Sequence, residues 1–151
     1  MTTSLGRTPY IFAFLFTLLL FLNGCGERVD KQYDRLEQAY DLTEKGWLPT
    51  WLPKDTFDLK VHYELDSNQV FLRLRTRENL EWMPKECLLS EFIDQLPASL
   101  PSWWPLNANR FSSLKKHYQI YLCKDEGLWW IAQPEQASFV LIWHQADKTQ
   151  L

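Results

Sequence analysis

Hydrophobic and polar residues alternate in two neighbouring stretches of the chain. Apolar side chains take every second position from 59 to 65, and the alternation returns from 70 to 77. A period of two directs one set of side chains toward a core and the other toward solvent, as in a half-buried strand. The residues between the stretches, Asp66-Ser67-Asn68-Gln69, favour a turn. The pattern therefore predicts a β-hairpin.

Three further short apolar stretches lie near the C-terminus. They are HYQIYLC at 117–123, GLWWIA at 127–132 and SFVLIWH at 138–144. Their length and their content of aromatic and β-branched residues are typical of strands, and the polar segments between them are short enough for turns. We expect an antiparallel meander here.

The segment from 27 to 45 has a different spacing. Val29, Tyr33, Leu36 and Tyr40 follow one another at steps of four, three and four. This spacing indicates one face of a helix, and Gly46 stands where a C-terminal cap is expected. The sequence thus predicts an N-terminal amphipathic helix that ends before Gly46.

The segments that connect the predicted elements are rich in proline. Trp47-Leu48-Pro49 is nearly repeated as Trp51-Leu52-Pro53, which predicts an extended loop over the core. Residues 88–96 are predicted to form a short helix, and prolines then surround Trp103-Trp104. The expected fold is α+β, with the N-terminal helix packed on a small antiparallel sheet of about five strands, namely the hairpin and the meander.

The first residues have the layout of a secretory signal. A single basic residue, Arg7, precedes a mostly apolar run from 10 to 22, which as a helix would span only about 20 Å. The run ends at Leu22-Asn23-Gly24-Cys25, which resembles the bacterial lipobox. The resemblance implies cleavage of residues 1–24 and lipid attachment to Cys25. The alternative is a buried or disulfide-bonded Cys25 behind an uncleaved anchor.

Such an anchor would place the protein in the cell envelope, attached to the membrane through the lipid on Cys25. In a Gram-negative host, the absence of aspartate at position 26 resembles the signal for the periplasmic face of the outer membrane. Residues 25–151 are then long enough for a single domain.

The charge of the chain bears on the class of partner, and its cysteines bear on the presence of a disulfide. Without Arg7 the mature chain has 15 basic and 19 acidic residues, a formal charge of −4, and no basic face that suggests nucleic acid. Disulfides persist in the envelope, so Cys87 and Cys123 are expected to form a bridge. Two buried free thiols are the alternative.

Two groups of residues are candidates for binding a partner. Alternate positions on one strand carry arginines, which either form a solvated sheet face or contact an acidic protein surface or lipid head groups. Tryptophans in proline-rich loops either pin those loops to the core, contact a protein or stack on sugars. The candidates are Trp47, Trp51, Trp103, Trp104, Arg73, Arg75 and Arg77.

No catalytic set is apparent in the sequence. His62, His117 and His144 lack a nucleophile motif and the spacing of zinc ligands, and the pairs Asp55/Asp58 and Asp125/Glu126 are typical of turns. We therefore expect no catalytic residue, no metal and no cofactor.

Several motifs occur in a characteristic order: GWLPTWLPKDTFDL, YELDSN, SWWP, YLCKDEGLWWIA and FVLIWH. In this order, over residues 46–144, the chain resembles a family of small bacterial lipoproteins similar to the YbbD head domain. The resemblance implies a shared fold, and it gives no activity or site residues to carry over.

The leading hypothesis is a non-catalytic envelope lipoprotein that binds an envelope protein, as an assembly factor or as an inhibitor of the immunity type. A peptidoglycan- or glycan-binding module is the alternative, and it requires a groove lined by the loop tryptophans. An enzyme of unrecognised type is the third hypothesis, and it requires a pocket where histidines and acids converge.

Overall fold

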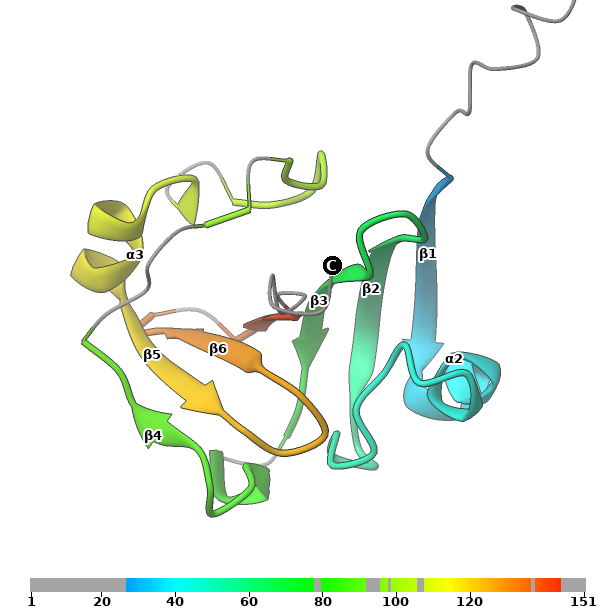
Figure 1. The fold of residues 1–151 in the computed structure, drawn as a ribbon. Coiled ribbons are helices and arrows are strands. Elements are labelled where there is room, and N and C mark those ends of the chain that lie inside the picture. Colours follow the sequence, from blue (N-terminus) through cyan, green and yellow to red (C-terminus); the bar gives the residue numbers. More distant parts are fainter. Residues whose placement is uncertain are drawn as a thin grey trace, which may run out of the picture.

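The computed structural model describes residues 27–77, 80–91, 96–97, 99–105, 108–136 and 138–144. Its centre is one antiparallel sheet of seven strands in the order β1-β2-β3-β7-β6-β5-β4 (Figure 1). The strands are β1 (Arg28–Arg35), β2 (Phe57–Glu64), β3 (Gln69–Arg75), β4 (Leu88–Leu89), β5 (Tyr118–Cys123), β6 (Trp129–Pro134) and β7 (Val140–His144). The helices are the 3-10 turns η1 (Leu36–Ala39) and η2 (Leu80–Trp82) and the short α-helices α2 (Tyr40–Glu44) and α3 (Phe111–His117).

The predicted hairpin and meander are confirmed. β2 and β3 pair around the turn at 65–68, where Asn68 adopts a φ of 50°. β5, β6 and β7 pair in sequence, and β7 also pairs with β3, so the hairpin and the meander form one continuous sheet. The antiparallel sheet is therefore confirmed, and the helices that accompany it are few and short. The expected count of about five strands is wrong because β1 and β4 extend the sheet at its two edges.

The predicted N-terminal helix is the main error. Residues 28–35 form β1, paired with β2 from Arg28↔Glu64 to Arg35↔Phe57, and helical turns begin only at Leu36. A step of four residues, as from Val29 to Tyr33, satisfies both a helical and a strand period. Lys31 lies between them on the same, half-buried face and hides the alternation, because a long lysine stem can be buried while its amine stays in water.

The predicted end of that helix is confirmed at Gly46. The glycine has a φ of +77° and its N–H donates to the Thr43 carbonyl at 3.0 Å, while the Trp47 N–H donates to the Leu42 carbonyl at 2.9 Å. These two bonds form a Schellman cap, which favours glycine at the left-handed position.

The short helix predicted over 88–96 is also wrong at its start. Leu88 and Leu89 form β4, which pairs with Leu122 and Tyr121 of β5. Residues 92–95 lie outside the described part of the chain. The disulfide between Cys87 and Cys123 is present, with their Cα atoms 4.0 Å apart, and it fixes this two-residue edge strand to β5.

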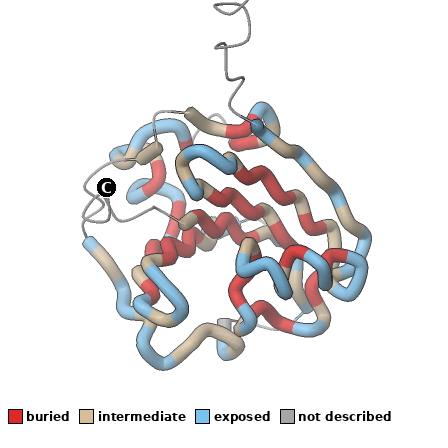
Figure 2. Tube along the Cα trace, turned by 45° about the vertical axis from the view of Figure 1, so that its right-hand side comes forward, coloured by how far each residue is buried: buried red, intermediate tan, exposed pale blue. Residues whose placement is uncertain are grey.

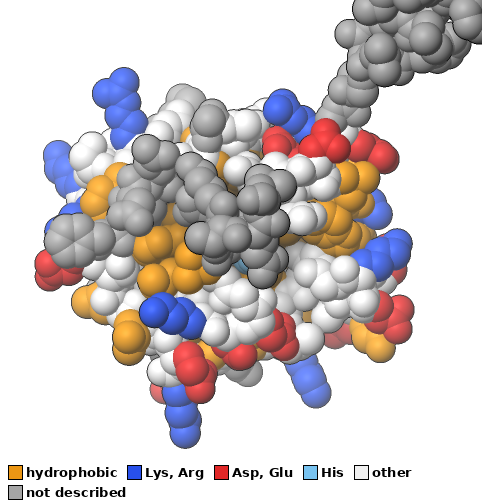
Figure 3. Space-filling view, in the orientation of Figure 1, with side chains coloured by type: hydrophobic (Ala, Val, Ile, Leu, Met, Phe, Trp, Pro, Cys, Tyr) orange, Lys and Arg blue, Asp and Glu red, His pale blue; other side chains and the backbone are white. Residues whose placement is uncertain are grey.

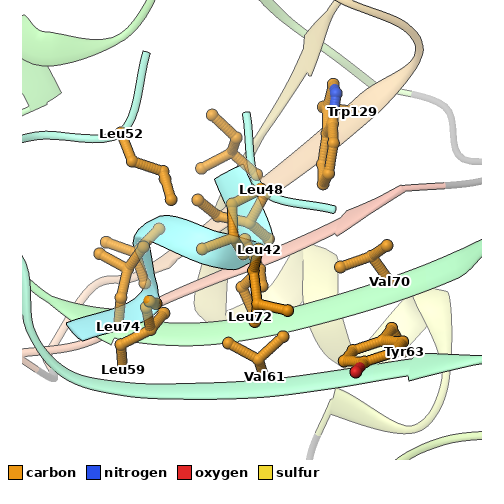
Figure 4. Packing of buried hydrophobic residues seen from close by; sticks show 14 of the residues in the cluster. Leu42, Leu48, Leu52, Leu59, Val61, Tyr63, Val70, Leu72, Leu74 and Trp129 are labelled. Carbon is orange, nitrogen blue, oxygen red and sulfur yellow. The ribbon is translucent and has the colours of Figure 1, made fainter. Parts of the chain in front are cut away.

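The sheet is covered on both faces. On the first face α2 and the loop after it pack on β1, β2 and β3, where Leu42, Leu48 and Leu72 are almost fully buried (Figure 4). On the second face the segment leading into α3 packs on β3, β5, β6 and β7 around Trp104 and Trp143. Figure 2 shows that buried residues lie along the central strands and that exposed residues are concentrated at the edges. Strands buried on both sides explain the nearly continuous apolar runs LWWIA and FVLIW.

Candidate functional site

The four loop tryptophans lie on opposite faces of the sheet. Trp47 and Trp51 pack with the first core and Trp103 and Trp104 with the second. The described residues therefore form no single groove that all four tryptophans line. Such a groove would be the best support for the glycan hypothesis.

Trp47 and Trp51 hold their loop to the sheet. The Trp47 ring stacks on Tyr63 with centroids 4.7 Å apart, and Trp51 stacks on Trp82 at 6.0 Å and meets the edge of Trp129 at 6.1 Å. Between them, Thr50 donates its N–H (2.9 Å) and its hydroxyl to the carboxylate of Glu126 in the β5–β6 turn. These contacts favour the loop-pinning interpretation for both tryptophans.

The neighbours Trp103 and Trp104 have different environments. Trp104 is 4% exposed, lies edge-on to Phe71 and Trp143 with each centroid 5.7 Å away, and donates its Nε1–H to the Ala108 carbonyl at 2.9 Å. Trp103 is half-buried, and its Nε1–H donates to Asp30 Oδ1 at 3.1 Å. Trp104 is thus a core residue, while Trp103 keeps part of its ring at the surface.

Trp103 forms one wall of a groove on the second face. The groove has a volume of about 690 Å³, and its walls include Arg73, Trp103, Pro105, His117, Pro134 and Phe139. Glu135 and Gln136, which are exposed, also line it. The structure thereby brings together Trp103 and Arg73, one candidate from each group, which are 30 positions apart and come from a loop and a strand.

Arg73 is held inside the groove by two contacts. Its Nη2 lies 3.2 Å from Asp58 Oδ2, and its guanidinium carbon lies 5.9 Å from the centre of the Phe139 ring. The Nε atom is buried and has no hydrogen-bond partner among the described residues. Arg75 approaches the same carboxylate oxygen, with its Nε 3.5 Å from Asp58 Oδ2.

The stripe of three arginines is therefore not uniform. Arg77 lies beyond the end of β3, its backbone N–H donates to Asp55 Oδ2 at 2.8 Å, and its side chain lines a different small hollow with Arg35 and Lys54. Asp58, which pairs with Arg73 and Arg75, lies at a β-bulge and has a φ of 47°. The bulge turns its side chain toward β3, and sequence alternation alone gives no sign of it.

A buried histidine between two carboxylates supports the Trp103 wall. His62 is 5% exposed, its Nδ1 lies 3.0 Å from Asp30 Oδ1, and its Nε2 lies 3.7 Å from Glu64 Oε1. Asp30 also accepts the Trp103 indole, and Glu64 accepts a hydrogen bond from Ser99 at 3.2 Å. The two carboxylates thus hold both ends of the segment from 99 to 103.

Glu64 is the most strongly paired acid of this cluster. Burial alone would raise the pKa of Glu64, but hydrogen bonds from Ser67 and Ser99 and the charge of Arg28 outweigh it and hold the pKa below its ordinary value. Arg28 Nε lies 3.0 Å from Glu64 Oε1. The alternation at 59–65 puts His62 at a polar position of its strand and gives no sign of this cluster, since the residues that cover it come from β1 and from the loop at 99–103.

The three histidines have separate surroundings. His62 is in the buried cluster, His117 lines the groove, and His144 lines a smaller hollow of about 280 Å³ beside Trp47 and Trp129. The described residues contain no group of three or more His, Cys, Asp or Glu side chains arranged to hold a metal ion. The structure therefore does not bring the histidines together.

Charged and hydrophobic side chains are interspersed around these features. Figure 3 shows apolar groups reaching the surface between lysines, arginines and acids on one face of the molecule. At the far edge of the sheet, Leu88 and Leu89 of β4 are 68% and 67% exposed. Within the described segments, no helix has the length and apolar character needed to cross a bilayer.

Comparison with known proteins gives one similarity. Residues 27–75 match the YbbD head domain. The match extends from β1 to β3 and includes α2 and the Trp-Leu-Pro loop, so the chain is similar to that domain over the first half of its sheet. It overlaps the first part of the range in which the sequence motifs suggested the resemblance. No curated protein and no solved structure matches the chain.

Proposed function

We propose that this chain is a cell-envelope lipoprotein, anchored through Cys25, whose domain binds a protein partner through the groove and catalyses no reaction. The observation that carries the proposal is the groove itself, which combines an aromatic wall, Trp103, with a recessed cation, Arg73. Aromatic residues and arginine are enriched at the energetic centres of protein interfaces. An assembly factor or an inhibitor of the immunity type would act in this way.

The proposed anchor is close to the folded domain. Cys25 lies outside the described residues, and β1 begins three positions later at Arg28. Three residues span at most about 11 Å, so the domain would lie next to the membrane, at the periplasmic face of the outer membrane in a Gram-negative host. The partner would then be an envelope protein within reach of that surface.

The packing of the tryptophans favours a protein partner over a glycan. Sugar recognition needs open aromatic faces, but Trp104 is buried and Trp47 and Trp51 use their rings against Tyr63, Trp82 and Trp129. Of the four candidates, Trp103 is the one that lines the groove. A single such ring beside a cation suits a protein side chain or backbone segment.

The test is affinity capture from detergent-solubilised envelopes with the full lipid-anchored chain, followed by mass spectrometry. We expect one envelope protein to co-purify, to be lost with Trp103→Ala, to be partly retained with Trp103→Phe and to be fully retained with Arg77→Gln. Arg77 is the matched control because it is an exposed arginine outside the groove. Equal capture by Trp103→Ala, or sedimentation with purified peptidoglycan in place of a protein partner, would contradict the proposal.

A further inference from the structure

We infer that the groove takes an extended segment of the partner that carries a carboxylate, and that Arg73 pairs with this carboxylate. The inference deepens the proposed function and rests on it, because it assigns the chemistry of the partner at the same groove.

The first argument is the state of the Arg73 guanidinium. It contacts one oxygen of Asp58 through Nη2, and its Nε is enclosed, so a ligand can reach the guanidinium only through the terminal nitrogens. The Phe139 ring, 5.9 Å away, adds a cation–π contact that keeps the cation in the groove. A guanidinium has five N–H donors, and the Asp58 contact involves one nitrogen, so the terminal nitrogens can donate a charge-assisted hydrogen bond to a second carboxylate.

The second argument is charge. Arg73 and Arg75 share a single carboxylate oxygen of Asp58, so this group of three keeps a net positive charge. His117, a further groove residue, follows Lys115 and Lys116 in the last turn of α3. Among the described residues that line the groove, the acid is Glu135. The charge is therefore positive at the Arg73 end of the groove, where two arginines face one carboxylate, although the whole chain is acidic, and an acidic group is the electrostatic complement there.

The third argument is shape. A volume of about 690 Å³ exceeds what one side chain fills, and the groove is open and has walls of Trp103, Phe139, Pro105 and Pro134. Aromatic-lined grooves of this type suit extended, proline-containing segments. Lipid head groups are a poorer fit, because the Arg73 side chain is only 23% exposed and lies inside the groove. The occupant we assign is thus a protein segment with an apolar or proline residue beside an Asp or Glu.

The test uses a displayed library of random twelve-residue peptides selected on the full chain in detergent. We expect the selected peptides to be enriched in Asp or Glu next to Pro or an aliphatic residue. Binding should fall about 10- to 100-fold with Arg73→Gln, as for the loss of a charge-assisted hydrogen bond, and should be unchanged with Arg77→Gln. Arg73→Lys, which keeps the charge and loses the fork, should fall between the two.

A second variant, expected to strengthen binding, distinguishes a lost contact from a folding defect in Arg73→Gln. Glu135 is exposed, so Glu135→Gln leaves the packing intact and removes the groove's own negative charge. It should strengthen binding of the acidic peptides about two- to five-fold, the scale of an exposed charge interaction.

Three outcomes would overturn the inference: no enriched peptide, enriched peptides without acids, or acidic peptides that bind Arg73→Gln and Glu135→Gln as well as the unchanged protein. If, in addition, the envelope partner were still lost with Trp103→Ala, the proposed function would stand and only the chemistry assigned to the partner would fail. If the partner bound Trp103→Ala normally, the proposed function would fail as well.

Discussion

At the scale of single residues, two hydrogen-bonded carboxylates hold the Trp103 wall of the groove against the sheet. Asp30 joins β1 to His62 and to Trp103, and Glu64 joins β2 to Arg28 and to Ser99. Little of this could be predicted from sequence, because an acid on a polar strand face looks the same whether it faces water or a loop from seventy residues away. Arg73 and Trp103 were predicted as candidates, but their meeting in one groove depends on the crossing of chain segments.

Glu64 gives a prediction about pH. Its pKa in the folded protein is lowered, so it stabilises the folded state above its unfolded pKa of about 4.3, and this contribution is lost as the pH falls through the folded value. We expect Glu64→Gln to lower the free energy of unfolding at pH 6–7 and the difference from the unchanged protein to shrink below about pH 4. Urea unfolding followed by tryptophan fluorescence at several pH values measures this.

The exposed Glu37 is the control for that series. Glu37→Gln should leave the free energy of unfolding nearly unchanged at every pH, since surface substitutions usually change stability by less than about 0.5 kcal/mol. A difference between Glu64→Gln and the unchanged protein that stayed constant from pH 7 to pH 3 would show that Glu64 does not titrate as the structure implies.

At the scale of elements, sequence patterns located the central strands well and the edges poorly. The hairpin and meander follow from a period of two and from long apolar runs, and the Gly46 cap follows from a single glycine. β1 was mistaken for a helix because its apolar residues are four apart, and β4 is too short, at two residues, to have a period. Both are edge strands, where pairing on one side only and charged side chains weaken the signal.

The disulfide is the covalent support of the β4 edge. Removing it with the double variant Cys87→Ser/Cys123→Ser should lower the free energy of unfolding by about 4 kcal/mol on the chain-entropy estimate for a sequence separation of 36. In reducing buffer the urea midpoint of the unchanged protein should fall to that of the double variant. A midpoint that did not respond to reducing agent would mean that the bridge does not support the folded domain.

At the scale of the whole molecule, the two covered faces have different roles in our account. The first face holds the Trp-Leu-Pro loop and α2, and these two segments belong to the region similar to the YbbD head domain. The second face carries the groove, whose walls come largely from residues 103–139, after that region ends. We therefore expect the shared part of the fold to act as a scaffold and the groove to give this chain its own partner.

The proposed lipid anchor involves Cys25, which lies outside the described residues. We expect the unchanged chain to incorporate radiolabelled palmitate and to sediment with membranes, and Cys25→Ser to lose both while its domain still folds. The double variant of Cys87 and Cys123 should keep the label. Palmitate incorporation into Cys25→Ser, or complete release of the unchanged chain in aqueous buffer, would rule out the lipid anchor.

Site-specific photo-crosslinking in living cells tests the central claim most directly. A benzoylphenylalanine in place of Gln136, an exposed residue of the groove, would be compared with one in place of Lys54, an exposed residue away from it. Our account predicts one discrete protein adduct from position 136, absent from position 54 and lost when Trp103→Ala is added. Adducts of equal strength from both positions, or an adduct at 136 that survives Trp103→Ala, would contradict it.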